Sequence, residues 1–351
     1  MLQFPIVQTN KELQKQAEQI LLLAKTLQVV PILPSVKPKV FHQQFLKSSL
    51  FSAKIEGNKL TLIEVENKVN LQGRQRERKE VNNLLRIMQK LPQLSLPKQK
   101  KQLQVLHKQI MNGITPDAGK VRSESSAIFD QFGNIVYLTP SPVELQKMLE
   151  VIFSEFKRQF DSQKLALQLC HIAACHYYFE KIHPFLDGNG RTGRVIMHLQ
   201  FQKTNLFDQF ILPIDEYFEK NKSEYYLHLD KNTRRLSSFY TFFLQGMIES
   251  LENILGDVKK ITENELFLAQ NQTQDTAQQR VNDNLQNLLP RRQEILAILQ
   301  DHPFSSLDFL ARRFPTLSQR TLAYDLQWLV THQFVTKHGS TRGASYSTKN
   351  N

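Results

Sequence analysis

The hydrophobic and polar positions repeat with helical spacing along most of the chain. Residues 11–27 place apolar side chains three and four positions apart, which predicts an amphipathic helix. Residues 29–38 hold three prolines, which predicts a connector. Helical patterns continue to about residue 112 and resume between about residues 141 and 260. The protein is therefore expected to be mainly α-helical.

One segment interrupts the helical pattern. In residues 119–140, alternating apolar positions flank Gly133 and Asn134, a pair that is typical of turns. This segment predicts a short β-hairpin. Directly after it, Ser141 and Glu144 have the spacing of a capping box, so a helix is expected to restart there.

The C-terminal part of the chain reads as a separate unit. Residues 268–284 are polar and rich in Gln and Asn, which predicts a linker or a solvated helix. Beyond them, residues 291–300, 305–314 and 318–333 predict three helices, and residues 334–348 predict two short strands around a turn.

Composition narrows the class of protein only in part. At 351 residues, two domains are expected, and the net charge of +12 suits nucleotides, nucleic acid, acidic proteins or plain solvation. Cys170 and Cys175 are the only cysteines, which argues against a disulfide scaffold and favours a reducing cytoplasm. The N-terminal residues do not resemble a signal peptide, and no long apolar run predicts a membrane span.

The segment IHPFLDGNGRTGR, residues 182–194, carries the candidate chemistry. Pro184 ends an apolar helix, which places His183 at a helix terminus. Gly188 and Gly190 then leave the backbone N–H groups bare where the next helix begins. Such a loop at a helix N-terminus is suited to binding an anion.

The charged residues of the same segment extend this picture. Arg191 and Arg194 are three apart on one helix face, so their guanidinium groups can bind successive phosphates. Asp187 is a hard oxygen ligand suited to Mg²⁺, and His183 can accept a proton at neutral pH. Together they predict a site for a polyphosphate–metal complex with a general base beside it.

The segment matches, at every defined position, the Fic family signature His-Pro-Phe-x-Asp-Gly-Asn-Gly-Arg-x-x-Arg. The chain therefore resembles a Fic family protein. The resemblance implies a mainly α fold, in which an all-helical Fic core carries the predicted hairpin as a short flap that lines up the target. It also implies transfer of AMP from ATP to a Ser, Thr or Tyr hydroxyl of a target protein, the protein itself included, with Mg²⁺ or Mn²⁺ as the metal.

The resemblance also implies a role for each motif residue. His183 would deprotonate the target hydroxyl, and Phe185 would anchor the loop in the core. Asp187 would hold the metal on the α- and β-phosphates. Arg191 would contact the β-phosphate and Arg194 the γ-phosphate. The residues that would cradle the phosphates are Gly188, Asn189 and Gly190.

A second motif, SAKIEGN, lies at residues 52–58. Ser52 and Glu56 are four apart and share a helix face, and Gly57 can end that helix. The motif resembles the inhibitory helix of the Fic family. The resemblance implies that Glu56 pairs with Arg194 and so keeps the ATP γ-phosphate from binding productively. The same Glu56 could position a water for removal of AMP.

Two further segments have competing interpretations. Tyr225 and Tyr226 resemble a family segment near the adenine, although core aromatic packing explains them equally well. Residues 170–176, CHIAACH, have Cys and His at helical spacing. Without a second ligand pair, we interpret them as part of a buried helix rather than as a zinc site.

The tail resembles a winged helix-turn-helix domain with residues 318–333 as its recognition helix. Its expected buried stripe is Leu322, Leu326, Leu329 and Val330, and its expected outward residues are Gln319, Arg320 and Tyr324. Residues 285–351 hold eight Lys or Arg and four Asp or Glu, a surplus of only four positive charges. Arg320, Lys337 and Arg342 could contact phosphates, so DNA and protein both stay open as partners of the tail.

These interpretations divide the chain into residues 1–115, an N-terminal helical region with the inhibitory helix at about 47–57; 116–260, the Fic core with its flap; 261–288, a polar linker; and 289–351, the winged helix-turn-helix domain. The favoured function is a cytoplasmic protein adenylyltransferase without a membrane partner. The alternative is a DNA-binding transcriptional regulator whose Fic core senses a nucleotide. Self-association is compatible with both.

Overall fold

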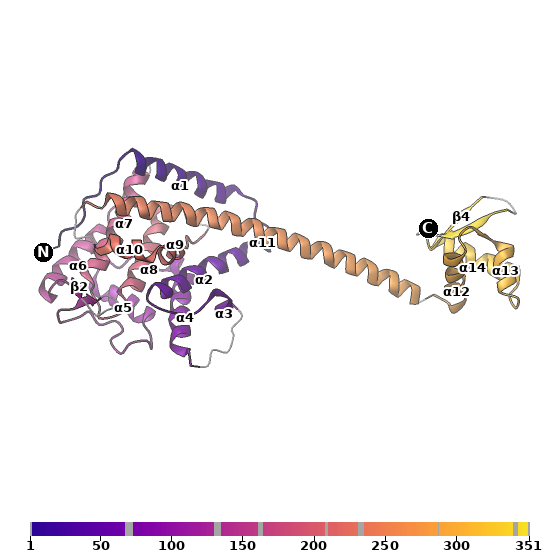
Figure 1. The fold of residues 1–351 in the computed structure, drawn as a ribbon, viewed down its shortest axis with the longest axis horizontal. Coiled ribbons are helices and arrows are strands. Elements are labelled where there is room, and N and C mark those ends of the chain that lie inside the picture. Colours follow the sequence, from indigo (N-terminus) through magenta and orange to yellow (C-terminus); the bar gives the residue numbers. More distant parts are fainter. Residues whose placement is uncertain are drawn as a thin grey trace. The chain divides into compact units, whose positions relative to one another are not determined.

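The computed structural model describes residues 2–66, 73–129, 135–160, 164–207, 210–230, 235–286, 288–339 and 343–349. The chain forms two compact units, Met1–Glu265 and Leu266–Asn351 (Figure 1). Among the described residues, no helix has the length and apolar character needed to cross a bilayer.

The first unit is built of helices and one β-hairpin. Its helices are α1 (Lys11–Val29), α2 (Lys37–Ile55), α3 (Leu62–Glu66), α4 (Gln75–Gln89), α5 (Lys100–Ile110), α6 (Pro142–Glu155), α7 (Leu165–Ile182), α8 (Asn189–Phe201), α9 (Ile214–Lys220), α10 (Lys222–Asp230) and the start of α11 (Ser237–Gln286). Two short 3₁₀ turns lie at Leu91–Gln93 and Gln202–Thr204.

Helices α7 and α8 form the centre of this unit. Every residue of α8 is buried, and so is every residue of α7 from Leu169 to Ile182. A helix that is apolar on all sides is stable only when other elements surround it, which explains the apolar character of α7.

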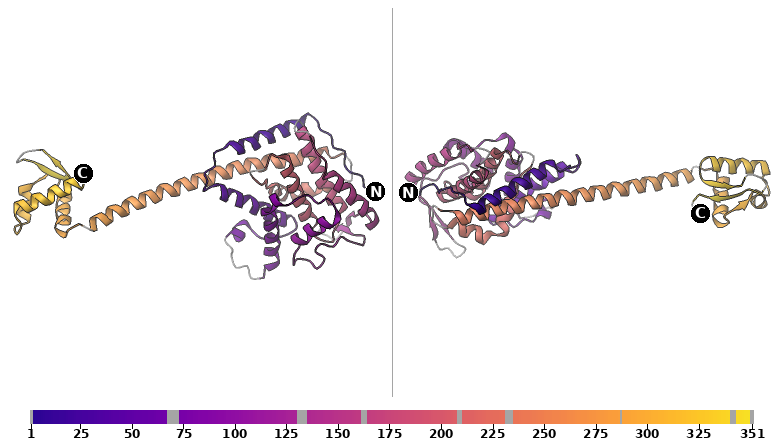
Figure 2. Two further views of the ribbon diagram at one scale, coloured as in Figure 1. Left: turned by 180° about the vertical axis from the view of Figure 1, so that it is seen from behind. Right: turned by 90° about the horizontal axis from the view of Figure 1, so that it is seen from above.

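Helix α1 runs beside the first part of α11 (Figures 1 and 2), and Gln16 donates a hydrogen bond to the Thr241 carbonyl at 3.3 Å.

Two apolar clusters meet at this central pair. One joins α7 and α8 to α1, α9 and α11, and the other joins them to α2, α4, α5 and α6. Tyr177 of α7 belongs to the first cluster, whereas Tyr178 and Phe179 belong to the second. The loop from α7 to α8 is therefore fixed by packing on both sides.

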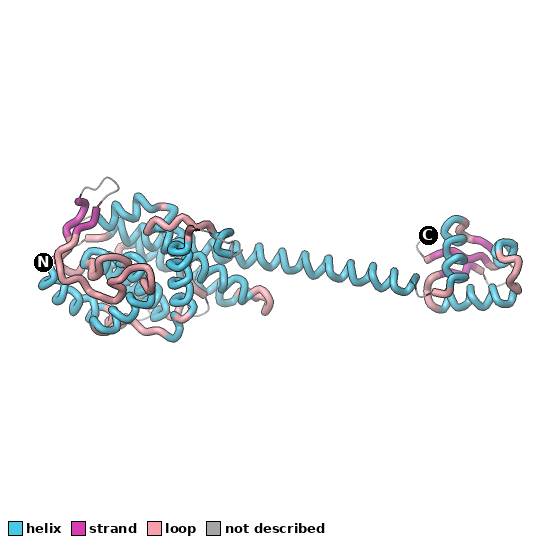
Figure 3. Tube along the Cα trace, turned by 90° about the horizontal axis from the view of Figure 1, so that it is seen from below, coloured by secondary structure: helices cyan, strands magenta, loops and turns pink. Residues whose placement is uncertain are grey.

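The hairpin and the capping box form where the sequence predicts them. Strands β1 (Ala127–Phe129) and β2 (Ile135–Leu138) pair antiparallel at the edge of the unit (Figure 3). The expected turn residues, Gly133 and Asn134, lie outside the described residues. Ser141 and Glu144 make both hydrogen bonds of the capping box at the start of α6.

Among the described residues, the second unit holds the end of α11, three further helices and a small sheet. Its elements after α11 are α12 (Pro290–Asp301), β3 (Ser305–Ser306), α13 (Leu307–Arg313), α14 (Gln319–Thr331), β4 (Val335–His338) and β5 (Ser345–Thr348). The strands form an antiparallel sheet in the order β3-β5-β4. Of the two interpretations of residues 268–284, the structure has the helix, because α11 continues to Gln286.

The expected helix over residues 305–314 is wrong at its start. Ser305 pairs with Tyr346 of β5, so the first two residues are a strand. The Ser306 hydroxyl accepts a hydrogen bond from the Phe309 N–H at 3.2 Å and caps α13. Serine favours this position because its side chain replaces a missing helical acceptor. The sheet consequently has three strands rather than the expected two.

The predicted stripe on α14 is largely correct. Leu322, Leu326 and Leu329 are buried, whereas Val330 is only partly buried. The expected outward residues Gln319, Arg320 and Tyr324 are all exposed. Arg342 lies outside the described residues.

The periodicity did not reveal a buried carboxylate on the same helix. Asp325 is fully buried and forms ion pairs with Arg291 and Arg292 of α12. The Arg292 guanidinium also lies over the Trp328 ring, 4.0 Å from its centroid. Burial raises the pKa of Asp325, but its bonds to the two arginines outweigh this and hold that pKa below the ordinary 3.8.

We predict that Asp325→Asn destabilises the second unit by about 3 kcal/mol, because two arginines lose their buried anion. Trp328 is the only tryptophan, so its fluorescence during denaturation reports this unit within the full chain. The exposed Asp301→Asn is the matched control. Since the folded pKa of Asp325 is depressed, its contribution should persist above pH 3.8 and disappear as the pH falls through that folded pKa. Equal stability of both variants would contradict the prediction.

Candidate active site

The loop between α7 and α8 turns sharply at both of its ends. His183 caps α7 with a φ of +46°, and Gly188 precedes α8 with a φ of +81°. A Cβ at Gly188 would lie 2.5 Å from the Met111 sulfur, so this position needs glycine for its conformation and for space. The turns place the histidine at one end of the loop and the N-terminus of α8 at the other.

Asn189 stabilises the loop from within. Its side-chain oxygen accepts from the Phe185 N–H at 2.9 Å, and its amide donates to the Phe185 carbonyl at 2.8 Å. Phe185 is fully buried, so this reciprocal pair fastens the loop to the core. The side chain of Asn189 is therefore not available to an anion, but its backbone N–H is. This N–H belongs to the first turn of α8, where backbone N–H groups have no acceptor within the helix.

The surroundings of His183 favour a neutral imidazole, and among the described residues its Nε2 has no hydrogen-bond partner. Nδ1 lies 3.1 Å from the Glu180 carbonyl oxygen, which only accepts, so Nδ1 carries the proton. Nε2 is then the nitrogen with a lone pair. Burial lowers the pKa of His183 below its ordinary value of 6.5, although the Glu180 carbonyl works against this shift. The histidine is therefore in the form that accepts a proton through Nε2.

Two residues that the sequence analysis missed hold this loop in place. Buried Arg122 donates to the carbonyls of His183 at 2.8 Å and Pro140 at 2.6 Å, so it ties the loop to the end of the hairpin segment. Nδ1 of His107 accepts from the Gly119 N–H at 2.8 Å. Nε2 of His107 must then carry the proton that it donates to the Asp187 carbonyl at 2.8 Å.

His107 also stacks on Phe185, with ring centroids 3.6 Å apart. The available sequence signal was a polar residue on the apolar face of α5, between buried Leu106 and Ile110. No comparable pattern marks Arg122.

Arg194 is the most enclosed charge at the site, with a side chain that is 1% exposed. It donates to the Ser52 hydroxyl, the Ser52 carbonyl and Glu56 Oε1, each at 2.8 Å. Asp215 Oδ1 lies 3.6 Å from its Nε. Burial disfavours the charge on Glu56, but Arg194 and Arg191 hold its pKa below the ordinary value. The structure thus brings Ser52, Glu56 and Arg194 together.

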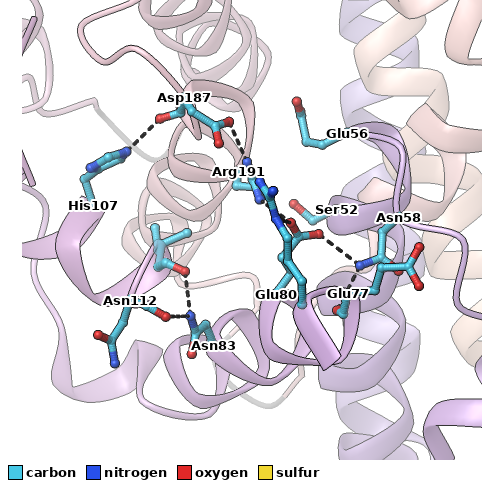
Figure 4. A network of polar contacts seen from close by, with 12 residues as sticks. Ser52, Glu56, Asn58, Glu77, Glu80, Asn83, His107, Asn112, Asp187 and Arg191 are labelled. Atoms are coloured by element: carbon cyan, nitrogen blue, oxygen red, sulfur yellow. Dashed lines mark hydrogen bonds and ion pairs between the residues drawn. The ribbon is translucent and has the colours of Figure 1, made fainter. Parts of the chain in front are cut away.

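Arg191 lies between two carboxylates (Figure 4). Its guanidinium contacts Asp187 Oδ1 at 2.7 Å and Glu80 Oε1 at 3.3 Å. Among the described residues, no group of three His, Cys, Asp or Glu could hold a metal ion. A single carboxylate such as Asp187, 43% exposed, nevertheless suits Mg²⁺, which takes most of its ligands from phosphates and water.

The two tyrosines have different surroundings. Tyr225 is buried, its hydroxyl lies 2.7 Å from His176 Nε2, and its ring stacks on Phe218. Tyr226 is 43% exposed and donates to the Ile55 carbonyl at the end of α2, at 3.1 Å. Tyr225 thus has the core packing that was one of its two interpretations, whereas Tyr226 contacts the helix that carries Ser52.

Residues 170–176 have the surroundings of a core helix. Cys170 and Cys175 are buried free thiols, and His171 lies 2.8 Å from Glu155. Burial raises the pKa of Cys170 to about 12, so it stays a neutral thiol within this apolar helix.

Residues 97–201 match the family model described as Fic/DOC, and this range contains the loop and both of its helices. These residues therefore form a Fic/DOC family domain. The chain is 27% identical over 158 residues to the protein adenylyltransferase fic-1 of Caenorhabditis briggsae, a match that covers 44% of this chain and 28% of that protein. The protein adenylyltransferase Fic of Nematostella vectensis is 31% identical over 94 residues, or 26% of this chain and 20% of its own. The matched region is less than a third of these relatives.

Solved structures show the same fold. A Fic family protein from Desulfovibrio desulfuricans has a TM-score of 0.62 at 18% identity, over 99% of both chains. Residues 134–508 of Fic-1 from Caenorhabditis elegans have a TM-score of 0.57 at 20% identity, over 71% of this chain and 73% of that one. At these identities the likeness concerns the fold alone.

We predict that His183 titrates below pH 6.5, the value from which burial lowers its pKa. A nitrogen–proton correlation spectrum of the labelled protein, with the resonance assigned by its loss in His183→Ala, should show a proton on Nδ1 of the neutral ring. Because the folded pKa is below the unfolded one, protonation should destabilise the fold as the pH drops below 6.5. A midpoint above 6.5, or a proton on Nε2, would refute this assignment.

Proposed function

We propose that this protein transfers AMP from ATP to a Ser, Thr or Tyr hydroxyl of a target protein. The observation that carries the proposal is the bond between His183 Nδ1 and the Glu180 carbonyl, which leaves Nε2 to accept a proton at the end of the short loop that leads into α8 and its two arginines. A base, an anion-binding helix end and two cations are what a phosphoryl group needs when a hydroxyl attacks it. The names of the relatives, protein adenylyltransferases, support the same chemistry.

In this reaction the target oxygen forms a bond to the α-phosphorus of ATP, and the bond from that phosphorus to the β-phosphate oxygen breaks. Pyrophosphate leaves, and the hydroxyl proton moves to Nε2 of His183. The Glu180 carbonyl keeps the proton of the other nitrogen in place, and Arg122 holds the His183 backbone. Asp187 would hold Mg²⁺ or Mn²⁺, which supplies positive charge to the phosphates when bound.

The assignment of the phosphate contacts is part of this proposal. Gly188, Asn189 and Gly190 would offer backbone N–H groups, Arg191 the β-phosphate contact and Arg194 the γ-phosphate contact. A close approach of phosphate to Gly190 requires that Glu56 move, since a mere Cβ there would lie 2.2 Å from Glu56 Oε1. Glu56 therefore restrains the enzyme by occupying both Arg194 and the space beside Gly190.

The hairpin supports a protein as the acceptor. Within the described residues, the β1–β2 sheet has only two strands, so its outer edges are free to pair with an extended segment. Ile135 and Leu138 of β2 are 57% and 69% exposed, which adds apolar surface at this edge. The target would thus align through main-chain pairing rather than through a specific sequence.

The role of the second unit belongs to the proposal as well. Arg320 and Lys337 are exposed, as a contact with DNA phosphates would require. A protein partner suits the same surface, and the modest positive surplus does not separate the two. Removal of AMP through a water positioned by Glu56 is likewise compatible with the site.

We predict that Glu56→Gly raises AMP transfer by about 10²-fold, because freeing Arg194 lets the γ-phosphate align for attack. Transfer of label from α-³²P-ATP to the protein itself or to an added target measures the effect. Adding Arg194→Ala should abolish the gain, since both residues act through one contact. Glu66→Gly, which removes another exposed acid nearby in sequence, is the control. A double variant as active as Glu56→Gly would contradict the mechanism.

We predict that His183→Ala lowers transfer by roughly 10²–10⁴-fold, the usual effect of losing a general base. The measurement is made in the Glu56→Gly background, where transfer is expected to be strong. His42→Ala, at an exposed histidine, is the matched control and should retain activity. Undiminished transfer by the His183 variant would eliminate this residue as the base.

A further inference from the structure

Arg191 has surroundings that the motif does not account for. Its side chain is 5% exposed, and its two contacts are with Asp187 and with Glu80 of α4. Its Nε is buried and has no hydrogen-bond acceptor among the described residues. A buried guanidinium normally uses all its donors, so an open one points to a ligand oxygen that completes the shell.

Asn58 holds the Glu80 carboxylate on the side away from Arg191. Its Oε2 accepts from the Asn58 amide at 3.0 Å, and the same amide donates to the Glu77 carbonyl at 2.9 Å (Figure 4). The Asn58 oxygen in turn accepts from the Leu60 N–H at 3.1 Å, which fixes the orientation of the amide. Glu80 and Asn58 are both largely buried, with 12% of the Glu80 side chain and 6% of Asn58 exposed.

The two carboxylates around Arg191 differ in what a bound nucleotide would do to them. Asp187 is 43% exposed and can turn toward a metal on the phosphates. Glu80 is enclosed and bound to Asn58, so it stays beside Arg191 when the phosphates arrive. A fixed carboxylate and a phosphate oxygen compete for one guanidinium and repel each other.

Asn58 also links Glu80 to the inhibitory residue. It follows Glu56 by two residues, across Gly57 at a φ of +97°. One short turn thus delivers Glu56 to Arg194 and, through Asn58, fixes Glu80 on Arg191.

On the proposed function, we infer that Glu80 is a second restraining carboxylate, which binds Arg191 as Glu56 binds Arg194, and that Asn58 couples the two. The resting site then blocks the contacts to two phosphates rather than one. Glu80 would act on the β-phosphate contact and Glu56 on the γ-phosphate contact.

The Glu80→Gln variant tests this role, because it removes the contact with Arg191 and keeps the size of the side chain. Because the Asn58 amide points its NH₂ at position 80, the new side chain must present its oxygen there and its own NH₂ to Arg191. Two donors cannot bond, so Arg191 is released without a change in side-chain volume. The matched control is Arg76→Ala, which removes an exposed cation 3.7 Å from the same carboxylate.

The test measures binding of AMP, ADP and ATP with Mg²⁺ to the full chain by calorimetry. Glu80→Gln should bind ADP and ATP about tenfold more tightly than the wild type, the usual worth of one bond to a charged group. AMP affinity should not change, since AMP has no β-phosphate. Arg76→Ala should match the wild type for all three nucleotides. Unchanged or weaker ADP binding by Glu80→Gln, or an equal change for AMP, overturns the inference.

Two further variants complete the test. Where thermal unfolding shows that Glu80→Gln disturbs the fold, Glu80→Asp withdraws the carboxylate by one methylene and should still tighten ADP binding. Asn58→Ala loosens both carboxylates, so ADP affinity and AMP transfer should rise together. Unchanged values for both would overturn the coupling.

The experiments distinguish failure of the proposed function from failure of this inference. If Glu56→Gly transfers AMP while Glu80→Gln leaves ADP affinity unchanged, only the role of Glu80 is wrong. If no variant transfers AMP, yet Glu80→Gln tightens ADP and not AMP, Glu80 restrains a nucleotide site of another function. If no variant binds any of the nucleotides, both are wrong.

Discussion

The guanidinium of Arg194 is the charge on which the site depends. With 1% of its side chain exposed, it has lost nearly all contact with water, so it must have anionic or carbonyl partners within the protein. Ser52, Glu56 and Asp215 provide them. Because two of these partners come from the segment 52–56, the charge of Arg194 on α8 is satisfied only when α2 is docked. The contact between Glu56 and Arg194 thus contributes to the stability of the first unit.

The same enclosure sets the protonation of the residues around it. Burial lowers the pKa of His183 and raises that of Glu180 to about 8, with Arg194 opposing and Glu56 adding to the second shift. Both groups are therefore favoured in their neutral forms near neutral pH. The site already holds the two arginines of the motif, and a neutral His183 adds no third positive charge to them. The neutral form is also the one in which an imidazole can accept a proton.

The sequence predicted those features of the fold and the site whose residues are close together in the chain. The loop motif, the Ser52–Glu56 pair and the helix caps depend on neighbours a few positions apart, so spacing reveals them. Asn58, Glu80, His107 and Arg122 act on the loop from other helices and segments, and no local period encodes those contacts. Glu80 follows the charge-rich residues 74–79, a pattern that is typical of a solvated helix face, yet its carboxylate is largely buried and contacts Arg191. Ser305 and Ser306 were missed because a capped helix start and a short strand share one local pattern.

On the proposed function, the buried Arg194 guanidinium needs an anionic partner in both the restrained and the nucleotide-bound state. A buried guanidinium without an anion is costly, so release of Glu56 from Arg194 is favourable only when another anion takes its place. The γ-phosphate of ATP is such an anion, and a nucleotide without it leaves Glu56 as the better partner. Binding of ATP and release of Glu56 are therefore linked, and the same differential affinity governs both. A Glu56 that leaves Arg194 stays charged at neutral pH, because its ordinary pKa is 4.5, so its carboxylate must then be solvated or paired elsewhere.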